Sequence, residues 1–147
     1  MLFEVLSTLS TGLFAGAAFY ISVVEHPARI QCGVDLALQV FRSSYRKGAP
    51  FMGSLLLTGL ASVIASWLST SNAWWVIGGV PLLFSLSFTI IFVLPISKKL
   101  LDPSLSADHN LASKLLRRWA ALHWLRSLMG LTSFLTFLIL LVKGAVK

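Results

Sequence analysis

Two groups of polar side chains interrupt an otherwise apolar sequence, and both contain residues that can move protons. The first group is the run Glu25, His26 and Pro27, which follows the apolar stretch 2–24 directly. A carboxylate and an imidazole are the side chains that most often act as general acids or bases. Proline is a helix breaker, so the run also has the form of a helix boundary. It is either the end of a membrane span or one half of a chemical site.

The second group lies in the segment RRWAALHWLR, near the carboxyl end of the chain. Trp119, His123 and Arg126 are spaced i, i+4 and i+7 there. On a helix this spacing places all three side chains on one face. The face would combine an aromatic wall, a proton acceptor and a fixed positive charge.

The composition decides which kind of element must position these residues. Of the 147 residues, 56% are hydrophobic and 12% are charged, and the mean hydropathy is +0.84. Soluble domains carry roughly 25% charged residues, so this composition indicates a membrane protein. The net charge of +7 then sets topology and meets anionic headgroups, and it does not indicate a nucleic-acid binder. The lone Cys32 excludes an internal disulfide.

Four apolar segments are long enough to cross a bilayer core of about 30 Å, which takes about 20 helical residues. They are 2–24, 51–68, 74–96 and 120–142. Helices and closed barrels are the structures that satisfy backbone hydrogen bonds in lipid, and these segments lack the alternation of barrel strands. The sequence therefore predicts an all-α, integral membrane four-helix bundle, with residues 1–147 forming one transmembrane domain.

The connection between the first two spans has a helical pattern of its own. Leu38, Phe41 and Tyr45 are spaced i, i+3 and i+7, and the basic residues fall largely on another face. Pro50 follows, where a helix would be expected to end. We therefore expect a short amphipathic helix over 33–47 that lies in the membrane interface.

The basic residues are distributed unevenly between the two sides of the bundle. The loops 25–50 and 97–119 hold most of them, whereas Lys143 and Lys147 are the basic residues of the opposite side. Basic residues favour the cytoplasmic side of a membrane. The charge pattern therefore places both loops in the cytoplasm and both termini on the opposite side.

The length of the fourth span makes Arg126 unusual. The segment 127–142 is only about 24 Å long, so the span must draw in residues 120–126 to cross the membrane. A charge at that depth is costly and generally faces the interior of a bundle with a partner, for which Glu25 is the nearest candidate. Alternatively, Arg126 snorkels to the headgroups and Glu25 is an ordinary interfacial residue.

Metal binding has weaker support in the sequence. His26, His123 and a carboxylate could hold iron or copper, but no HxxxH or HxxE spacing is present. A haem between the two histidines is favoured even less. No resident cofactor is therefore favoured.

Several stretches, in order along nearly the whole chain, resemble the anthrone oxygenase-like family of small four-span membrane proteins. They are GLFAGAAFYISVVEHPAR, FRSSYRKGAP, LPISKKLL and RRWAALHWLR. The most specific are the glycine-rich first span that ends in EHP and the pattern W-x-x-x-H-x-x-R. The matching positions are Glu25, His26, Pro27, Tyr45, Arg46, Pro95, Asn110, Trp119, His123 and Arg126.

The resemblance implies a function as well as a fold. Characterised fungal members oxidise anthrones to anthraquinones with dioxygen, which implies a membrane-embedded oxidoreductase or oxygenase acting on a lipophilic aromatic compound, anthrone- or phenol-like, at the cytoplasmic membrane face. Dioxygen would be the co-substrate. His26 or His123 would be the base and Arg126 would stabilise the oxyanion. The remaining expected site residues are Glu25, Trp119, Tyr45 and Asn110, with Trp119 forming part of the pocket wall.

Two other readings of the same residues stay open at this stage. The chain could be a non-enzymatic membrane bundle that binds lipid or a partner protein, with Glu25 and Arg126 as a structural clamp. It could also be a haem- or metal-binding membrane protein. In every case the expected partners are membrane lipids and a hydrophobic small molecule, not nucleic acid, and the sequence leaves open whether the chain forms a homo-oligomer.

Overall fold

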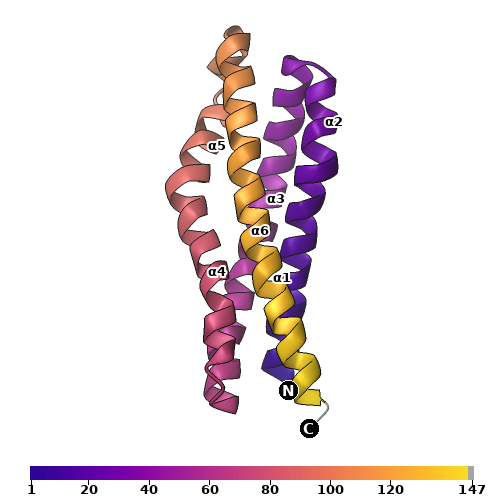
Figure 1. Cartoon of the computed structure of the whole chain (residues 1–147). Helices are drawn as coiled ribbons and strands as arrows, with labels where there is room; N and C mark the ends of the chain where they lie inside the picture. The colour runs from indigo at the N-terminus through magenta and orange to yellow at the C-terminus, as the bar shows by residue number, and fades with distance from the viewer. Residues whose placement is uncertain (146–147) are drawn as a thin grey trace.

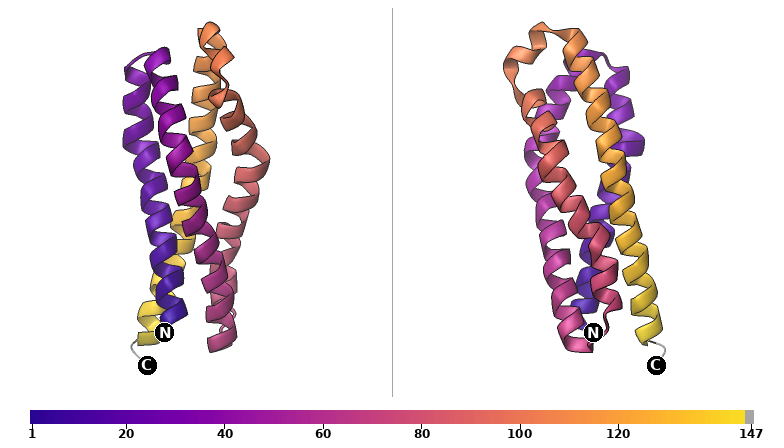
Figure 2. Two further views of the ribbon diagram at one scale, coloured as in Figure 1. Left: turned by 180° about the vertical axis from the view of Figure 1, so that it is seen from behind. Right: turned by 60° about the vertical axis from the view of Figure 1, so that its left-hand side comes forward.

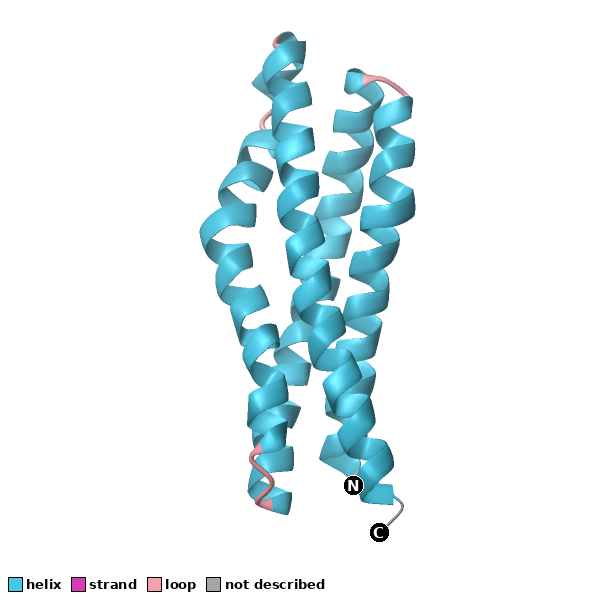
Figure 3. Cartoon of the chain, viewed as in Figure 1, coloured by secondary structure: helices cyan, strands magenta, loops and turns pink. Residues whose placement is uncertain are grey.

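The computed structural model describes residues 1–145 and is built from helices (Figures 1 and 3). The elements in chain order are α1 (Leu2–Tyr20), the π-helix η1 (Ile21–Glu25), α2 (His26–Gln31), α3 (Val34–Thr70), α4 (Trp74–Phe88), the π-helix η2 (Thr89–Val93), α5 (Leu94–Leu101), the 3-10 helix η3 (Pro103–Ala107) and α6 (His109–Ala145). Successive elements join into four helical units, 2–31, 34–70, 74–101 and 109–144. Each unit is long and apolar enough to cross a membrane.

The predicted four-helix membrane bundle is therefore confirmed. Both termini lie at one end of the bundle, and the α2–α3 and α5–α6 connections lie at the other (Figures 1 and 2). This arrangement agrees with two long connections on one side of the membrane. Which side is cytoplasmic stays a prediction from charge, and Lys147, which contributed to that count, lies outside the described residues.

The expected interfacial helix over 33–47 is wrong as a separate element. Residues 34–70 form one continuous helix of 37 residues, and Pro50 lies inside it. The apolar face of the first turns is buried in the bundle instead of lying on the membrane surface. Leu38 and Phe41 are 1% and 0% exposed and belong to the same packed cluster as Leu100 and Leu116. Packing against α5 and α6 therefore makes this segment part of the bundle.

Pro27 does not end the first helical unit either. The N–H of His26, the residue before the proline, bonds to the carbonyl of Ile21 in a π turn, and the helix continues to Gln31. A wider turn of this kind accommodates a residue that cannot donate to the regular ladder. The unit ends at Gln31, and the chain turns at Gly33, whose φ of 89° belongs to the left-handed region that favours glycine.

The third helical unit also has a π turn directly before a proline. The N–H of Leu94 bonds to the carbonyl of Thr89, and Pro95 follows directly. The unit therefore changes its winding at η2, where it bows away from α3 in the view from behind (Figure 2). Both π turns lie beside the cavity described next.

Small residues bring α1 and α6 close together in the middle of the bundle. A Cβ atom added to Gly130 would lie 2.8 Å from the ring of Phe14, and one added to Gly12 would lie 2.7 Å from the ring of Phe134. Each aromatic ring therefore occupies the space that a glycine leaves on the opposite helix. This packing fixes the position of Phe14, which forms part of the cavity wall.

Candidate functional site

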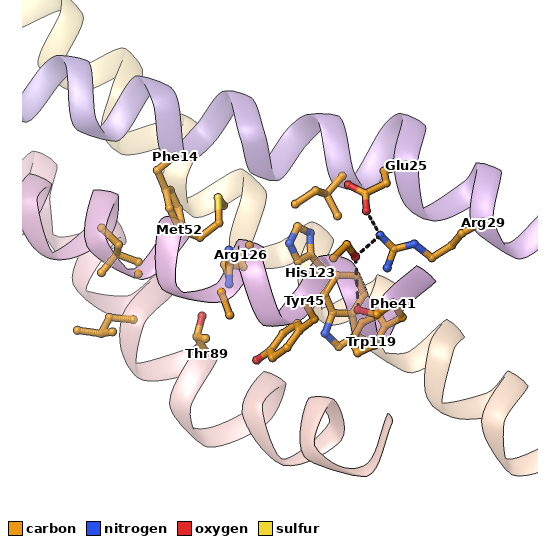
Figure 4. Close-up of a pocket in the computed structure, with 17 residues that line it drawn as sticks. Phe14, Glu25, Arg29, Phe41, Tyr45, Met52, Thr89, Trp119, His123 and Arg126 are labelled. Atoms are coloured by element: carbon orange, nitrogen blue, oxygen red, sulfur yellow. Dashed lines mark hydrogen bonds and ion pairs between the residues drawn. The ribbon is translucent and has the colours of Figure 1, made fainter. Parts of the chain in front are cut away.

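A cavity of about 170 Å³ lies among α1, α3, α4 and α6 (Figure 4). Its lining combines aromatic and aliphatic side chains with a few polar groups. Of the expected site residues, the structure brings together Glu25, Tyr45, Trp119, His123 and Arg126 around it. His26 and Asn110 are not among the lining residues.

Arg126 faces the interior of the bundle, as its depth in the fourth span predicts. Its guanidinium lies 5.1 Å from the centre of the Phe14 ring, a cation–π contact. Its buried Nε has no hydrogen-bond partner, and no carboxylate pairs with it among residues 1–145. The expected ion pair with Glu25 is therefore not formed, and neither is the structural clamp that it would have provided.

Glu25 pairs with Arg29, a residue that sequence reasoning missed. The two are spaced i, i+4 across Pro27, and the Arg29 side chain is 3% exposed. Arg29 also donates to the hydroxyl of Ser44 at 3.2 Å, and its guanidinium lies 5.6 Å from the Phe41 ring. The i, i+4 spacing is a known signal for ion pairs on helices. It was lost here because Pro27 was expected to end the helix.

His123 is held by two serine hydroxyls. Its Nδ1 lies 3.0 Å from the Ser22 hydroxyl and 3.5 Å from that of Ser127. Each serine also reaches a backbone carbonyl: Ser22 that of Ala18 at 3.0 Å, and Ser127 that of His123 itself at 2.8 Å.

The Ser22 and Ser127 hydroxyls also lie 3.1 Å from each other, so they share their protons among the two carbonyls, each other and His123. Where Ser22 donates its proton to the Ala18 carbonyl, its oxygen is left as an acceptor for His123. Nδ1 of His123 then carries the ring proton and donates it, which leaves the lone pair on Nε2. A ring with its second nitrogen fixed in this way is prepared to act as a base.

Trp119 forms one wall of the cavity and is fixed on several sides. Its indole N–H donates to the Ser97 hydroxyl at 3.0 Å, and its ring centre lies 4.6 Å from that of His123. Phe41 meets it edge-on at 5.1 Å, and Tyr45 stacks on Phe41 at 5.3 Å. The wall is therefore a connected aromatic group with little freedom to move.

His26 and Asn110 have surroundings different from those expected. His26 is 4% exposed, its ring centre lies 5.2 Å from that of Trp119, and neither of its ring nitrogens has a hydrogen-bond partner within residues 1–145. Asn110 is an exposed residue in the first turn of α6. Of the two candidate bases, His123 is therefore the one that lines the cavity.

The charges around the cavity do not cancel. Glu25 neutralises Arg29, whereas Arg126 has no acidic neighbour of its own. In a site of low polarity, an uncompensated guanidinium favours a bound group that is or becomes negative. In the part of the chain that the structure describes, no three His, Cys, Asp or Glu side chains gather as metal ligands.

The fold and the cavity define a small multi-pass membrane protein with an aromatic-walled, cationic site inside its helical bundle. Residues 41–136 match the family model described as anthrone oxygenase. This chain belongs to the anthrone oxygenase family. No curated protein and no solved structure matches the chain. The matched region contains Tyr45, Trp119, His123 and Arg126, whereas Glu25 and the other site residues of the first helical unit precede it.

Proposed function

We propose that this chain is a membrane oxygenase that removes a proton from an acidic, lipophilic aromatic compound and lets the resulting anion react with dioxygen. Membership of the anthrone oxygenase family supports the reaction class. The observation that carries the assignment is the pairing, around one cavity, of His123 with Arg126: a base whose Nδ1 is held by Ser22 and a guanidinium without a carboxylate partner.

The two residues would act on different atoms of the substrate. Nε2 of His123 takes the proton from the methylene carbon of an anthrone-like compound, or from the hydroxyl of a phenol, whose anion also carries negative charge on a ring carbon. The negative charge spreads onto the substrate oxygen, where the guanidinium of Arg126 stabilises it. The carbanion then gives its electrons to dioxygen, and the hydroperoxide that forms loses water to leave a new carbonyl. Trp119 and Phe14 would hold the flat ring system during these steps.

The test is oxygen consumption by the purified protein in lipid nanodiscs, with anthrone as the substrate. One dioxygen should be consumed for each anthraquinone formed. His123→Ala should lower kcat by about 10²- to 10⁴-fold, because it removes the base. Arg126→Gln should lower kcat by about 10²- to 10³-fold, because it removes the charge that stabilises the oxyanion.

The matched control is His109→Ala. His109 is a solvent-exposed histidine 3.1 Å from the carboxylate of Asp35, and it does not line the cavity. Its removal should leave kcat within about twofold, as is usual for surface substitutions. A protein that consumes no oxygen with anthrone or with related phenols would contradict the proposed function.

A further inference from the structure

The cavity has a lateral boundary between α3 and the α4–η2 segment, which we call the window. It is formed by Tyr45, Gly48, Ala49 and Gly53 on one side and by Leu86 and Thr89 on the other. All six residues are partly exposed. A Cβ atom added to Gly48 or Gly53 would meet no heavy atom within 4 Å. The backbone of α3 therefore borders open space at this level.

Helix α3 is in contact with the third helical unit on both sides of the window, with α4 on one side and with α5 on the other. Towards the termini, a Cβ added to Gly79 of α4 would lie 2.8 Å from the Val63 side chain of α3. Towards the long connections, Arg42 of α3 donates to the carbonyl of Leu100 at 3.1 Å. Between these contacts the π turn η2 bows outward (Figure 2). The opening is therefore bounded at both ends.

The window lies where the apolar segments of α3 and α4–η2 approach the membrane interface. Gly53, Leu86 and Thr89 belong to the apolar segments 51–68 and 74–96, whereas Tyr45, Gly48 and Ala49 lie just before the first of these segments, next to Arg46 and Lys47. Large apolar side chains on the same two segments point away from the protein, namely Phe51, Leu57, Phe84, Ile91 and Phe92. A compound that passes the window can therefore keep an apolar part among these lipid-facing side chains while its polar part lies at the membrane interface.

The cavity is small for a compound of several rings. Its volume of about 170 Å³ is close to that of an engineered cavity of about 150 Å³ that holds a single benzene. The enclosed space thus takes about one ring, and anything larger must extend through the window. The polar end of the ligand belongs inside, because Arg126 has a buried Nε without a partner there.

We propose that the ligand of this chain is a membrane-dissolved phenol with an apolar tail, which inserts its acidic ring through the window and leaves the tail between α3 and η2, in contact with lipid. The inference rests on the proposed function for the role of Arg126, and it adds the class of substrate and its route. Gly48 and Gly53 are the residues that give the tail its place.

The test uses two coloured phenols that differ in the tail: 4-octyl-2-nitrophenol and 4-methyl-2-nitrophenol. Both absorb at longer wavelength when ionised, so a titration with protein in nanodiscs reports binding next to Arg126. The octyl compound should bind the unaltered protein more tightly. Gly53→Leu and Gly48→Leu, which fill the window, should weaken the octyl compound at least about tenfold, because a leucine side chain takes the place of the tail and the ring can then no longer reach Arg126 with the tail attached. The methyl compound should change by less than about threefold.

The matched control is Gly16→Leu. Gly16 also has open space around an added Cβ, but it lies on the exposed face of α1 and does not line the cavity. It should leave both affinities unchanged, and Arg126→Gln should abolish the absorbance change for both compounds. Because leucine favours a helix more than glycine does, the three variants should fold. Retained secondary structure by circular dichroism checks this.

The remaining outcomes overturn the proposal. Equal weakening of both phenols would make Gly48 and Gly53 part of the cavity wall only, and the absence of any advantage for the octyl tail would exclude a tail in the window. No binding of either phenol would exclude the ligand class. Failure of the proposed function is recognised separately: the phenols bind as expected, but no compound supports oxygen consumption.

Discussion

We propose that the hydroxyl of Ser22 decides which nitrogen of His123 is free to accept a proton. It lies 3.0 Å from Nδ1 and joins η1 to the base on α6. In many catalytic sites a carboxylate accepts the hydrogen bond from Nδ1 of the histidine and orients its ring. Here a hydroxyl that already donates to a backbone carbonyl acts instead, which orients the ring without adding a charge to the span.

Replacing Ser22 by alanine should therefore lower activity without unfolding the protein. Nδ1 would keep only the longer contact with Ser127, and the neutral ring would populate both tautomers. We expect kcat for anthrone oxidation to fall about tenfold, at the lower end of the effects of general-base catalysis. Ser22→Thr should restore most of it.

Ser133→Ala is the matched control for this change. Ser133 is a fully buried serine on α6, and its hydroxyl has no hydrogen-bond partner among the described residues. It does not line the cavity. Equal effects of the two alanine variants on kcat would show that Ser22 contributes packing and does not orient His123.

The pair formed by Glu25 and Arg29 is expected to contribute to stability. Arg29 is almost fully buried, whereas Glu25 is 28% exposed. Glu25→Gln would leave the arginine charge inside the bundle without its counter-ion. We expect a loss of about 2–3 kcal/mol in the free energy of unfolding, less than for a fully buried pair because water reaches Glu25.

Denaturant unfolding in detergent micelles measures this loss. Glu4→Gln is the control, because Glu4 pairs with the exposed amino terminus at 3.3 Å and with no buried cation. It should change stability by less than about 0.5 kcal/mol. A Glu25→Gln protein as stable as the unaltered one would mean that Ser44 and the Phe41 ring suffice to hold Arg29.

At the scale of the elements, two prolines widen the helices beside the cavity. Pro27 and Pro95 each follow a π turn, and Ile21 and Thr89 of these turns line the cavity. A π turn displaces the residues after it relative to a regular helix. The two prolines therefore lower the stability of their helices and, through the π turns before them, also help to set the shape of the cavity.

Pro95→Ala should separate stability from activity. Alanine supplies the missing N–H to the Ile91 carbonyl, and it removes a residue that costs about 3 kcal/mol in a helix interior. We expect a higher melting temperature together with lower turnover, because a regular helix would draw η2 towards α3 and narrow the window. Thermal unfolding and oxygen consumption on the same sample measure both.

The control for this substitution is Pro103→Ala, in the 3-10 turn η3 far from the cavity lining. It should leave turnover unchanged. A Pro95→Ala protein with full activity would mean that η2 keeps its π turn without the proline, and that the bow has another cause.

The limits of sequence reasoning also appear at this scale. Hydropathy found all four spans, because a span is a local property of about 20 consecutive residues. The interfacial helix over 33–47 was wrong because the residues that bury its apolar face, such as Leu100 and Leu116, are distant in the sequence. Pro27 was interpreted as the end of the helix because a proline is visible in the sequence, whereas the π turn that accommodates it has no simple sequence signal.

The site was predictable to a similar extent. Trp119, His123 and Arg126 could be placed together because their spacing is helical. Ser22 and Phe14 could not, because each reaches the site through the packing of α1 on α6. Glu25 was expected to pair with Arg126 instead of Arg29 for the same reason. The sequence gives the depth of each side chain in the membrane, but not the direction in which it points around its helix.

At the scale of the whole molecule, the distribution of charge predicts a direction in the membrane. Most basic residues belong to the segments 25–50 and 97–119, and the α2–α3 and α5–α6 connections within these segments lie at the end of the bundle opposite the termini (Figure 1). The positive-inside rule places that end in the cytoplasm. The cavity lies nearer to it, since Arg29 and Trp119 line the cavity, and its substrate would then be drawn from the inner half of the bilayer.

Cys32 makes this direction measurable, because it is the one cysteine of the chain and is exposed in the α2–α3 connection. In intact cells a membrane-impermeant maleimide should leave it unlabelled, whereas a permeant maleimide should label it. The control is the double variant Cys32→Ser, Ser71→Cys, which moves the thiol to the exposed α3–α4 turn at the other end of the bundle. That protein should react with both reagents. The reverse pattern would place the long connections outside, and would mean that the positive charge of this chain meets its ligand or a partner instead of setting its topology.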